Sequence, residues 1–74
     1  MTKLEEKLKE LGYELSMTQT IYTPEYKVVK TYCKEVDNDN FNFINICENK
    51  IVKINPSNEI EMQKDLEILK GEER

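Results

Sequence analysis

Histidine is absent from this sequence of 74 residues, and cysteine occurs only at Cys33 and Cys47. Without histidine, no Ser–His or Cys–His pair can activate a nucleophile. Two cysteines without histidine are also too few to ligate a structural zinc ion. We therefore predict that the chain is not an enzyme, and we expect it to hold no metal ion and no cofactor.

Glycine is also scarce, with Gly12 and Gly71 the only two. Both fall at the ends of predicted helices, so no glycine-rich loop is available to cradle a phosphate. The segment 1–14 is charged and lacks the apolar core of a signal peptide, and no apolar run is long enough to span a membrane. These features predict a cytoplasmic protein with reduced thiols.

Acidic residues outnumber basic ones by 15 to 11, which gives a net charge of −4. This balance disfavours direct binding to nucleic acid unless the basic residues gather on one face. It favours a protein partner with a basic surface, although mild acidity also keeps small proteins soluble. At 74 residues the chain forms a single domain, 1–74, whose small core would gain from a homodimer.

The first predicted helix covers residues 3–11. Thr2 and Glu5 have the spacing of a capping box, in which each side chain bonds the backbone N–H of the other residue. Glu5 and Lys9 have the spacing of a favourable ion pair, and Gly12 accepts the left-handed conformation that ends many helices. One side of this helix is apolar because it carries Leu4, Leu8 and Leu11.

Hydrophobic alternation with a period of two predicts four strands, at residues 13–21, 26–33, 41–47 and 51–54. Turn-forming residues separate them at 23–25, 37–40 and 48–50. Because such short turns join antiparallel neighbours, we expect a meander of four antiparallel strands. The inward face of the second strand stays open, since both of its faces carry apolar residues.

The second predicted helix covers residues 57–70 and ends at Gly71, with 72–74 as a frayed tail. Asn55 is its predicted N-cap, and Pro56 takes the first helical position. The predicted fold is α+β in two layers: a short N-terminal helix, a four-stranded antiparallel meander sheet and a C-terminal helix.

The second helix has two apolar sides. The side that should meet the sheet carries Met62, Leu66 and Leu69. Ile60 and Ile68 lie on a different side, which makes them a candidate oligomer face.

Acidic residues form two groups that could contact a basic protein partner. One group lies at the turn between the second and third strands: Glu35, Asp37 and Asp39. The other lines the last helix: Glu59, Glu61 and Asp65. Acids near a helix N-terminus also stabilise the helix dipole, and a turn is normally solvated, so both groups have a structural explanation as well.

The same turn has part of the spacing of a calcium-binding loop. Counted from Asp37, Asp39 and Glu48 occupy ligand positions 3 and 12. Position 5 is Phe41, however, and Asn42 replaces the glycine required at position 6. The pattern therefore favours a solvated hairpin turn over a calcium site.

Tyrosines and lysines are interleaved around the first two strands, a pattern that could bind single-stranded nucleic acid by stacking. They are Tyr13, Tyr22, Tyr26 and Tyr32 with Lys27, Lys30 and Lys34. Cross-strand packing of the tyrosines, with the lysines turned outward, explains the pattern more simply. Both cysteines lie in predicted strands, where a free cysteine packs as a small apolar residue.

The segments "KLEEKLKELGYE" and "EMQKDLEILK" resemble parts of small uncharacterised accessory proteins from phages and prophages of low-GC Gram-positive bacteria. Some small acidic proteins of this kind inhibit host defence nucleases, including CRISPR effectors. The resemblance implies an accessory factor that acts in the cytoplasm of a bacterial host. It assigns no functional residues, because both segments are generic amphipathic helices.

The leading hypothesis is a non-enzymatic protein-binding module that inhibits a host nucleic-acid enzyme or defence nuclease by stoichiometric occlusion, as anti-CRISPR proteins do. One alternative is a homo-oligomeric assembly module joined through Ile60 and Ile68 or through an edge strand. The other is a weak binder of single-stranded nucleic acid that uses the strand rich in tyrosine and lysine.

Overall fold

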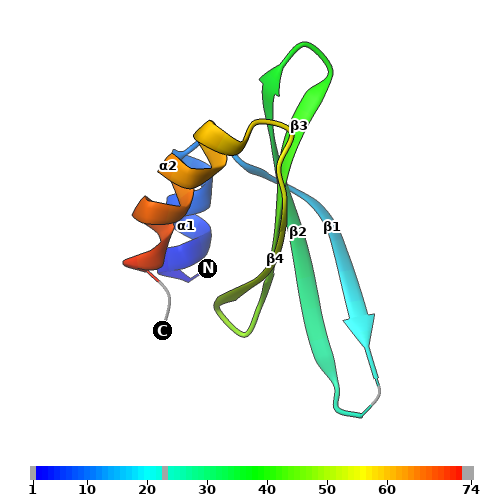
Figure 1. The fold of residues 1–74 in the computed structure, drawn as a ribbon. Helices are drawn as coiled ribbons and strands as arrows, with labels where there is room; N and C mark the ends of the chain where they lie inside the picture. The colour runs from blue at the N-terminus through cyan, green and yellow to red at the C-terminus, as the bar shows by residue number, and fades with distance from the viewer. Residues whose placement is uncertain (1, 23, 73–74) are drawn as a thin grey trace.

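The computed structural model describes residues 2–22 and 24–72 and contains six elements of secondary structure (Figure 1). In chain order they are α1 (Lys3–Glu10), β1 (Glu14–Ile21), β2 (Lys27–Asp37), β3 (Asn40–Cys47), β4 (Lys50–Asn55) and α2 (Glu59–Lys70). The strands form one antiparallel sheet in the order β1-β2-β3-β4. The predicted α+β fold, a four-stranded meander between two helices, is therefore confirmed.

Both helices lie on the same side of the sheet, with α1 beside α2, so the protein has two layers (Figure 1). No helix in the described ranges is both long and apolar enough to cross a membrane. Thr23, predicted to form a turn, and residues 73–74 of the predicted tail lie outside the described residues.

Helix α1 begins with the predicted capping box. The Thr2 hydroxyl accepts the N–H of Glu5, and Glu5 Oε1 accepts the N–H of Thr2, both at 3.2 Å. Gly12 has a φ of 98°, the left-handed conformation expected where this helix ends. The predicted Glu5–Lys9 ion pair is wrong, because Glu5 Oε2 binds Lys30 of β2 instead.

Two hairpin turns use left-handed residues that are not glycine. In the β3–β4 turn, Glu48 and Asn49 have φ values of 53° and 64°, as a type I′ turn requires. In the β2–β3 turn, Asp39 has a φ of 61°, and the N–H of Asn38 donates to Asp37 Oδ1 at 2.8 Å. Asparagine and aspartate tolerate this conformation better than most residues, and both predicted turns are confirmed.

The start of α2 corrects the sequence prediction. Its N-cap is Asn58 rather than Asn55, and the Asn58 side chain accepts the N–H of Glu61 at 3.0 Å. Asn55 is instead the last residue of β4. Pro56 therefore lies in the connection between strand and helix, not in the first helical turn.

A buried asparagine in β3, Asn42, explains this shift. Its Oδ1 accepts the N–H of Ser57 at 2.7 Å and that of Asn58 at 2.9 Å, and its Nδ2 donates to the carbonyl oxygen of Asn58 at 3.2 Å. The bonds satisfy a side chain that is fully buried. They also hold Asn58 in an extended conformation, so the helix begins at Glu59, two residues later than predicted.

Alternation along β2 and β3 decides which side chains meet the helices. Residues 28, 30, 32 and 34 of β2, with 42, 44 and 46 of β3, lie on the side we call the covered face. The odd-numbered residues between them lie on the opposite side, the open face. The core consists of Leu4, Leu8, Tyr13, Tyr32, Ile44, Ile46, Met62 and Leu69.

Candidate functional site

On the covered face, a carboxylate ties α1 to β2. Glu5 Oε2 accepts hydrogen bonds from Lys30 Nζ at 3.0 Å and from the Tyr32 hydroxyl at 2.8 Å. Its other oxygen is held by Thr2 in the capping box. The single side chain of Glu5 therefore both starts the helix and anchors it to the sheet.

A second carboxylate, Asp65, anchors α2 to β2. Asp65 Oδ2 accepts hydrogen bonds from the Tyr13 hydroxyl at 2.8 Å and from Lys34 Nζ. Lys34 Nζ also lies 3.4 Å from Glu61 Oε2 and 4.9 Å from the centre of the Tyr13 ring. Each helix is thus anchored through one buried carboxylate, one lysine of β2 and one tyrosine. The tyrosine is Tyr32 of β2 for α1, and Tyr13, which directly precedes β1, for α2.

Burial and hydrogen bonding set the protonation of these groups. Burial raises the pKa of Glu5, but hydrogen bonds, first from Lys30 and then from Tyr32, outweigh it and lower the pKa from 4.5 to about 2. Burial and the bond to Glu5 raise the pKa of Tyr32 to about 12. Burial and the bond to Asp65 raise the pKa of Tyr13 above its usual 10. At neutral pH, Glu5 is ionised and both hydroxyls keep their protons.

These contacts correct two predictions about the site. Asp65 was a predicted partner contact, but it is 4% exposed and bound by two side chains of its own chain. The lysines of β2 were expected to turn outward, yet Lys30 and Lys34 point at the helices. Four members of the predicted nucleic-acid surface are therefore taken up in the covered face: Tyr13, Tyr32, Lys30 and Lys34.

The other two tyrosines, Tyr22 and Tyr26, flank the β1–β2 turn and are 73% and 68% exposed. Their rings meet edge to face with centres 5.7 Å apart. Lys27, which follows Tyr26, is the one lysine of the predicted pattern that does not engage a helix carboxylate among the residues described.

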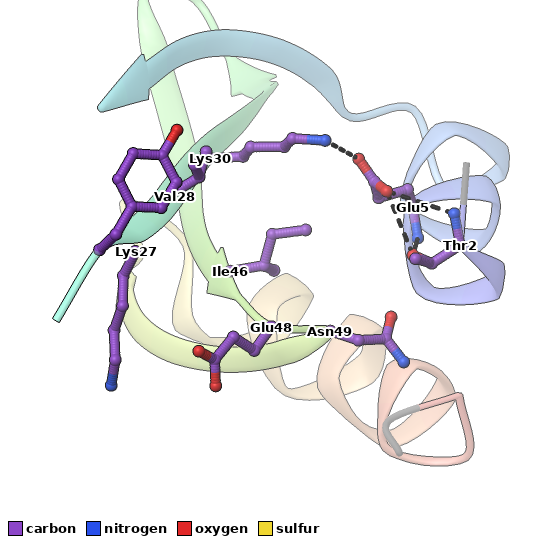
Figure 2. A pocket seen from close by; sticks show the side chains of 9 residues that line it. Thr2, Glu5, Lys27, Val28, Lys30, Ile46, Glu48 and Asn49 are labelled. Carbon is purple, nitrogen blue, oxygen red and sulfur yellow. Dashed lines mark hydrogen bonds and ion pairs between the residues drawn. The ribbon is translucent and has the colours of Figure 1, made fainter. Parts of the chain in front are cut away.

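A cleft of about 350 Å³ opens beside the Glu5 anchor (Figure 2). Figure 2 shows Lys30 reaching across it to Glu5, with Ile46 between the helix and the strand. Asn49 lies at the rim, and its Oδ1 is buried with no hydrogen-bond partner in the described chain. Thr2, Lys30 and Tyr32 together occupy both oxygens of Glu5, so this carboxylate is not free to act as an acid or base in the cleft.

The remaining predicted acids meet at one end of the molecule. The β2–β3 hairpin projects past both helices (Figure 1), and α2 begins beside its base because Asn42 of β3 holds the backbone at Asn58. We call this region the acidic end. It consists of Glu35, Asp37, Asp39 and Glu59, which are exposed, and Glu61, which is half-buried.

The acids of the hairpin support their own turn. The N–H of Asp39 donates to Glu35 Oε2 at 3.4 Å, while Asp37 accepts from Asn38. No group of three or more His, Cys, Asp or Glu side chains in residues 2–22 and 24–72 is placed to hold a metal ion.

The open face carries no helix or other element from the described ranges (Figure 1). A shallow hollow of about 440 Å³ crosses it, lined among others by Met17, Thr31, Phe43 and Asn45. Met17 is 54% exposed, and the rings of Phe41 and Phe43 lie 6.2 Å apart. Both free cysteines lie on this face and are half-exposed.

The candidate oligomer face on α2 is exposed but interrupted. Ile60 and Ile68 are 73% and 46% exposed, so neither packs on the sheet. Lys64 lies one turn from each of them on the same side of the helix and is also exposed. The two isoleucines therefore do not form one continuous apolar patch.

Sequence reasoning missed Asn42 and the role of Glu5. The sequence does contain a sign of the role of Asn42. It lies on the same face of its strand as Ile44 and Ile46, and a polar side chain on a buried face needs hydrogen-bond partners. Glu5 has none beyond its capping role, since its partners on β2 lie 25 and 27 residues away in the chain.

Comparison of the chain with protein-family models, with curated proteins and with solved structures finds no match.

Proposed function

We propose that this chain is a non-enzymatic protein-binding module that contacts a basic surface of its partner through the acidic end. The observation that carries the proposal is that all members of the acidic end except Glu61 make no ion pair with a described residue. Lys34, the residue next to Glu35, is held by Asp65 and Glu61 on the covered face. Apart from Glu61, the negative charges at this end are therefore not neutralised by an ion pair among residues 2–22 and 24–72.

The shape of the acidic end favours a concave partner. A projecting hairpin can enter a groove that a flat surface cannot reach, and grooves lined with Lys and Arg are typical of proteins that bind nucleic-acid phosphates. Carboxylates placed in such a groove speed association and exclude the phosphates. Together with the resemblance to phage accessory proteins, this supports a host nucleic-acid enzyme or defence nuclease as the partner, inhibited by stoichiometric occlusion.

The test begins with partners captured from a Gram-positive host lysate, each then purified and titrated with the protein. The variant Asp37→Lys, Asp39→Lys, Glu59→Lys reverses three charges of the acidic end. We expect it to bind about tenfold or more weakly at low salt, because charge complementarity is lost. We also expect the wild-type protein to displace nucleic acid from the partner at a ratio of one to one.

A matched control reverses three exposed acids elsewhere: Glu6→Lys, Glu25→Lys, Glu67→Lys. It changes the net charge equally, so it should bind much like the wild type. If both triple variants weaken binding equally, only net charge matters and the acidic end is not the contact site. If neither does, the electrostatic proposal is wrong.

A further inference from the structure

Three lysines lie on the open face, from the middle of the sheet to the end away from the β2–β3 hairpin. Lys53 of β4 pairs with Asn45, so it lies on this face, and Lys50 lies there too because it pairs with Cys47. Lys27 is the third, and Figure 2 shows its side chain pointing away from the covered face. None of them makes an ion pair with a described residue. Basic residues thus gather on one face, the condition under which an acidic chain can still bind nucleic acid.

The acids of the same face lie far from Lys53. Glu35 pairs with Phe41, four residues along the strands and two strands across from Lys53, or about 16 Å away. Glu14 pairs with Cys33 and lies two residues along and three strands across, also about 16 Å away. Both separations exceed the Debye length at physiological salt, about 8 Å. These acids are therefore largely screened from an anion held at Lys53.

Aromatic rings lie beside the lysines. Phe43 lines the hollow of about 440 Å³ together with Lys53. Phe41 is the next open-face residue of β3, and its ring lies 6.2 Å from that of Phe43. Phe41 is 37% exposed and Phe43 is half-buried, so both rings are accessible from the solvent side of the sheet. A nucleic-acid base can stack on such a ring whatever its identity, since every base has a π-face.

Two amides border the same hollow, Asn45 of β3 and Asn55 of β4. Neither side chain makes a hydrogen bond with a residue in the described ranges, in contrast to the buried amide of Asn42. An amide offers donors and an acceptor together, which matches the edge of a base. The hollow therefore combines a ring for a base, amides for its edge and a cation for its phosphate.

We infer that the open face binds single-stranded nucleic acid along β3 and β4. Bases stack on Phe43 and Phe41, while phosphates meet Lys53 and Lys50. The register places these two lysines about 7 Å apart along the strands, close enough to contact successive phosphates. None of these residues belongs to the acidic end, so the inference goes beyond the proposed function and does not depend on it.

Other occupants fit this face less well. A free nucleotide would stay largely exposed in a shallow hollow, whereas small-ligand sites enclose most of their ligand. A duplex keeps its base faces stacked inside, where the rings cannot reach them. A second copy packed about the middle of the sheet would bring the two Lys53 ammonium groups together.

The test is fluorescence anisotropy with a fluorescein-labelled thymidine DNA strand of about 12 nucleotides. We expect saturable binding at low salt that weakens as salt rises, because phosphate contacts release counterions. The same strand in a duplex, and thymidine monophosphate, should each bind at least tenfold more weakly. Absence of saturable binding would overturn the inference, and so would equal affinity for the duplex or for the mononucleotide.

Two variants separate stacking from charge. Phe43→Leu keeps an apolar side chain but removes the ring, and we expect about tenfold weaker binding. Lys50→Gln, Lys53→Gln changes two exposed side chains, so the fold should be retained. It should also weaken binding about tenfold, and lower the slope of log affinity against log salt by about 1.4. Wild-type affinity in the double lysine variant would contradict the inference, whether or not the Phe43 variant folds.

Matched controls lie on other surfaces. Lys9→Gln, Lys64→Gln removes the same charge from exposed positions on the helices and should bind like the wild type. Equal losses in both lysine variants would mean that only net charge matters. Tyr22→Leu, Tyr26→Leu should also bind like the wild type. A loss confined to that variant would place the strand at the β1–β2 turn and overturn the inference.

Cysteine accessibility gives a second readout. Cys33 pairs with Phe43 and Cys47 pairs with Lys50, and both thiols are half-exposed on the open face. We expect their alkylation by iodoacetamide to slow several-fold at saturating DNA. An unchanged rate would place the DNA elsewhere. Slowing that depends on protein concentration alone, without DNA, would show that a second copy covers this face instead.

Discussion

The two faces of the sheet use the same kinds of residue in opposite ways. On the covered face, Lys30 and Lys34 of β2 each meet a buried helix carboxylate. The odd-numbered residues of β2 lie on the open face, where Lys27 and Glu35 make no ion pair with any residue the structure describes. Charge on the covered face fixes the fold, whereas charge on the open face is available to a partner.

This contrast depends on burial rather than on residue type. A buried carboxylate that loses its partners keeps the cost of desolvation, so removing one member of such a cluster is expensive. An exposed carboxylate is solvated by water, so its removal changes stability little. Mutations that match in chemistry but differ in face should therefore separate the two roles.

The largest effect is expected for Asp65→Ala, since it leaves Lys34 and Tyr13 without their shared acceptor. We expect a loss of about 3 to 5 kcal/mol in the free energy of unfolding, measured by urea denaturation in dilute solution. The matched open-face change, Glu35→Ala, should cost less than about 0.5 kcal/mol. Equal losses would contradict the division between the two faces.

The next largest effect is a pH dependence of the free energy of unfolding that is caused by Glu5. Its pKa is about 2 in the folded protein and 4.5 ordinarily. Because folding lowers this pKa, the stabilisation is fully present above pH 4.5 and is lost as pH falls from 4.5 toward 2. The pKa difference corresponds to about 3 kcal/mol, of which about 2 kcal/mol is lost by pH 3.

Urea denaturation of the wild type and of Glu5→Gln at pH 5 and pH 3 measures this dependence. The stability gap between the two proteins should narrow by about 2 kcal/mol at the lower pH. An NMR titration of the carboxyl carbons supplies an independent check. If the Glu5 carboxyl protonates near pH 4.5 in the folded protein, its hydrogen bonds do not make the free energy of unfolding depend on pH, and the prediction is wrong.

The smallest effect compares two lysines of one strand. Lys30→Met removes the cation from Glu5, which keeps its bond from Tyr32, so we expect a loss of about 1 kcal/mol. The loss is modest because the Lys30 side chain is 39% exposed. Lys27→Met should leave the unfolding free energy of the dilute protein within about 0.5 kcal/mol of the wild type. A reversed order would require the register of β2 to be different.

Local patterns in the sequence predict much of this fold. The capping box at Thr2, the left-handed Gly12 and the hairpin turns depend on neighbouring residues, so their spacing alone identifies them. The start of α2 could not be found this way. It is set by Asn42, a residue from another element, which overrides the ordinary preference for proline in the first helical turn.

The candidate site was only partly predictable for the same reason. The acids of the β2–β3 turn are exposed because turns are exposed, and the sequence shows that directly. In the sequence, Asp65 cannot be distinguished from these exposed acids. It is nevertheless buried, and the hydroxyl of Tyr13, 52 residues away in the chain, donates a hydrogen bond to it. Whether a charge is internal or available depends on such distant partners, which hydrophobic periodicity does not encode.

Strand β2 holds both helices as well as two neighbouring strands, and this has a consequence for folding. Its hairpins join segments adjacent in the chain, whereas the side-chain bonds to α1 and α2 close loops of 25 residues or more. Loop closure of that length favours a sheet that forms before the helices dock. A sheet without its helices would expose both faces to solvent, and exposed apolar surface promotes aggregation. We therefore expect faster helix docking to increase the share of newly made chain that reaches the native state.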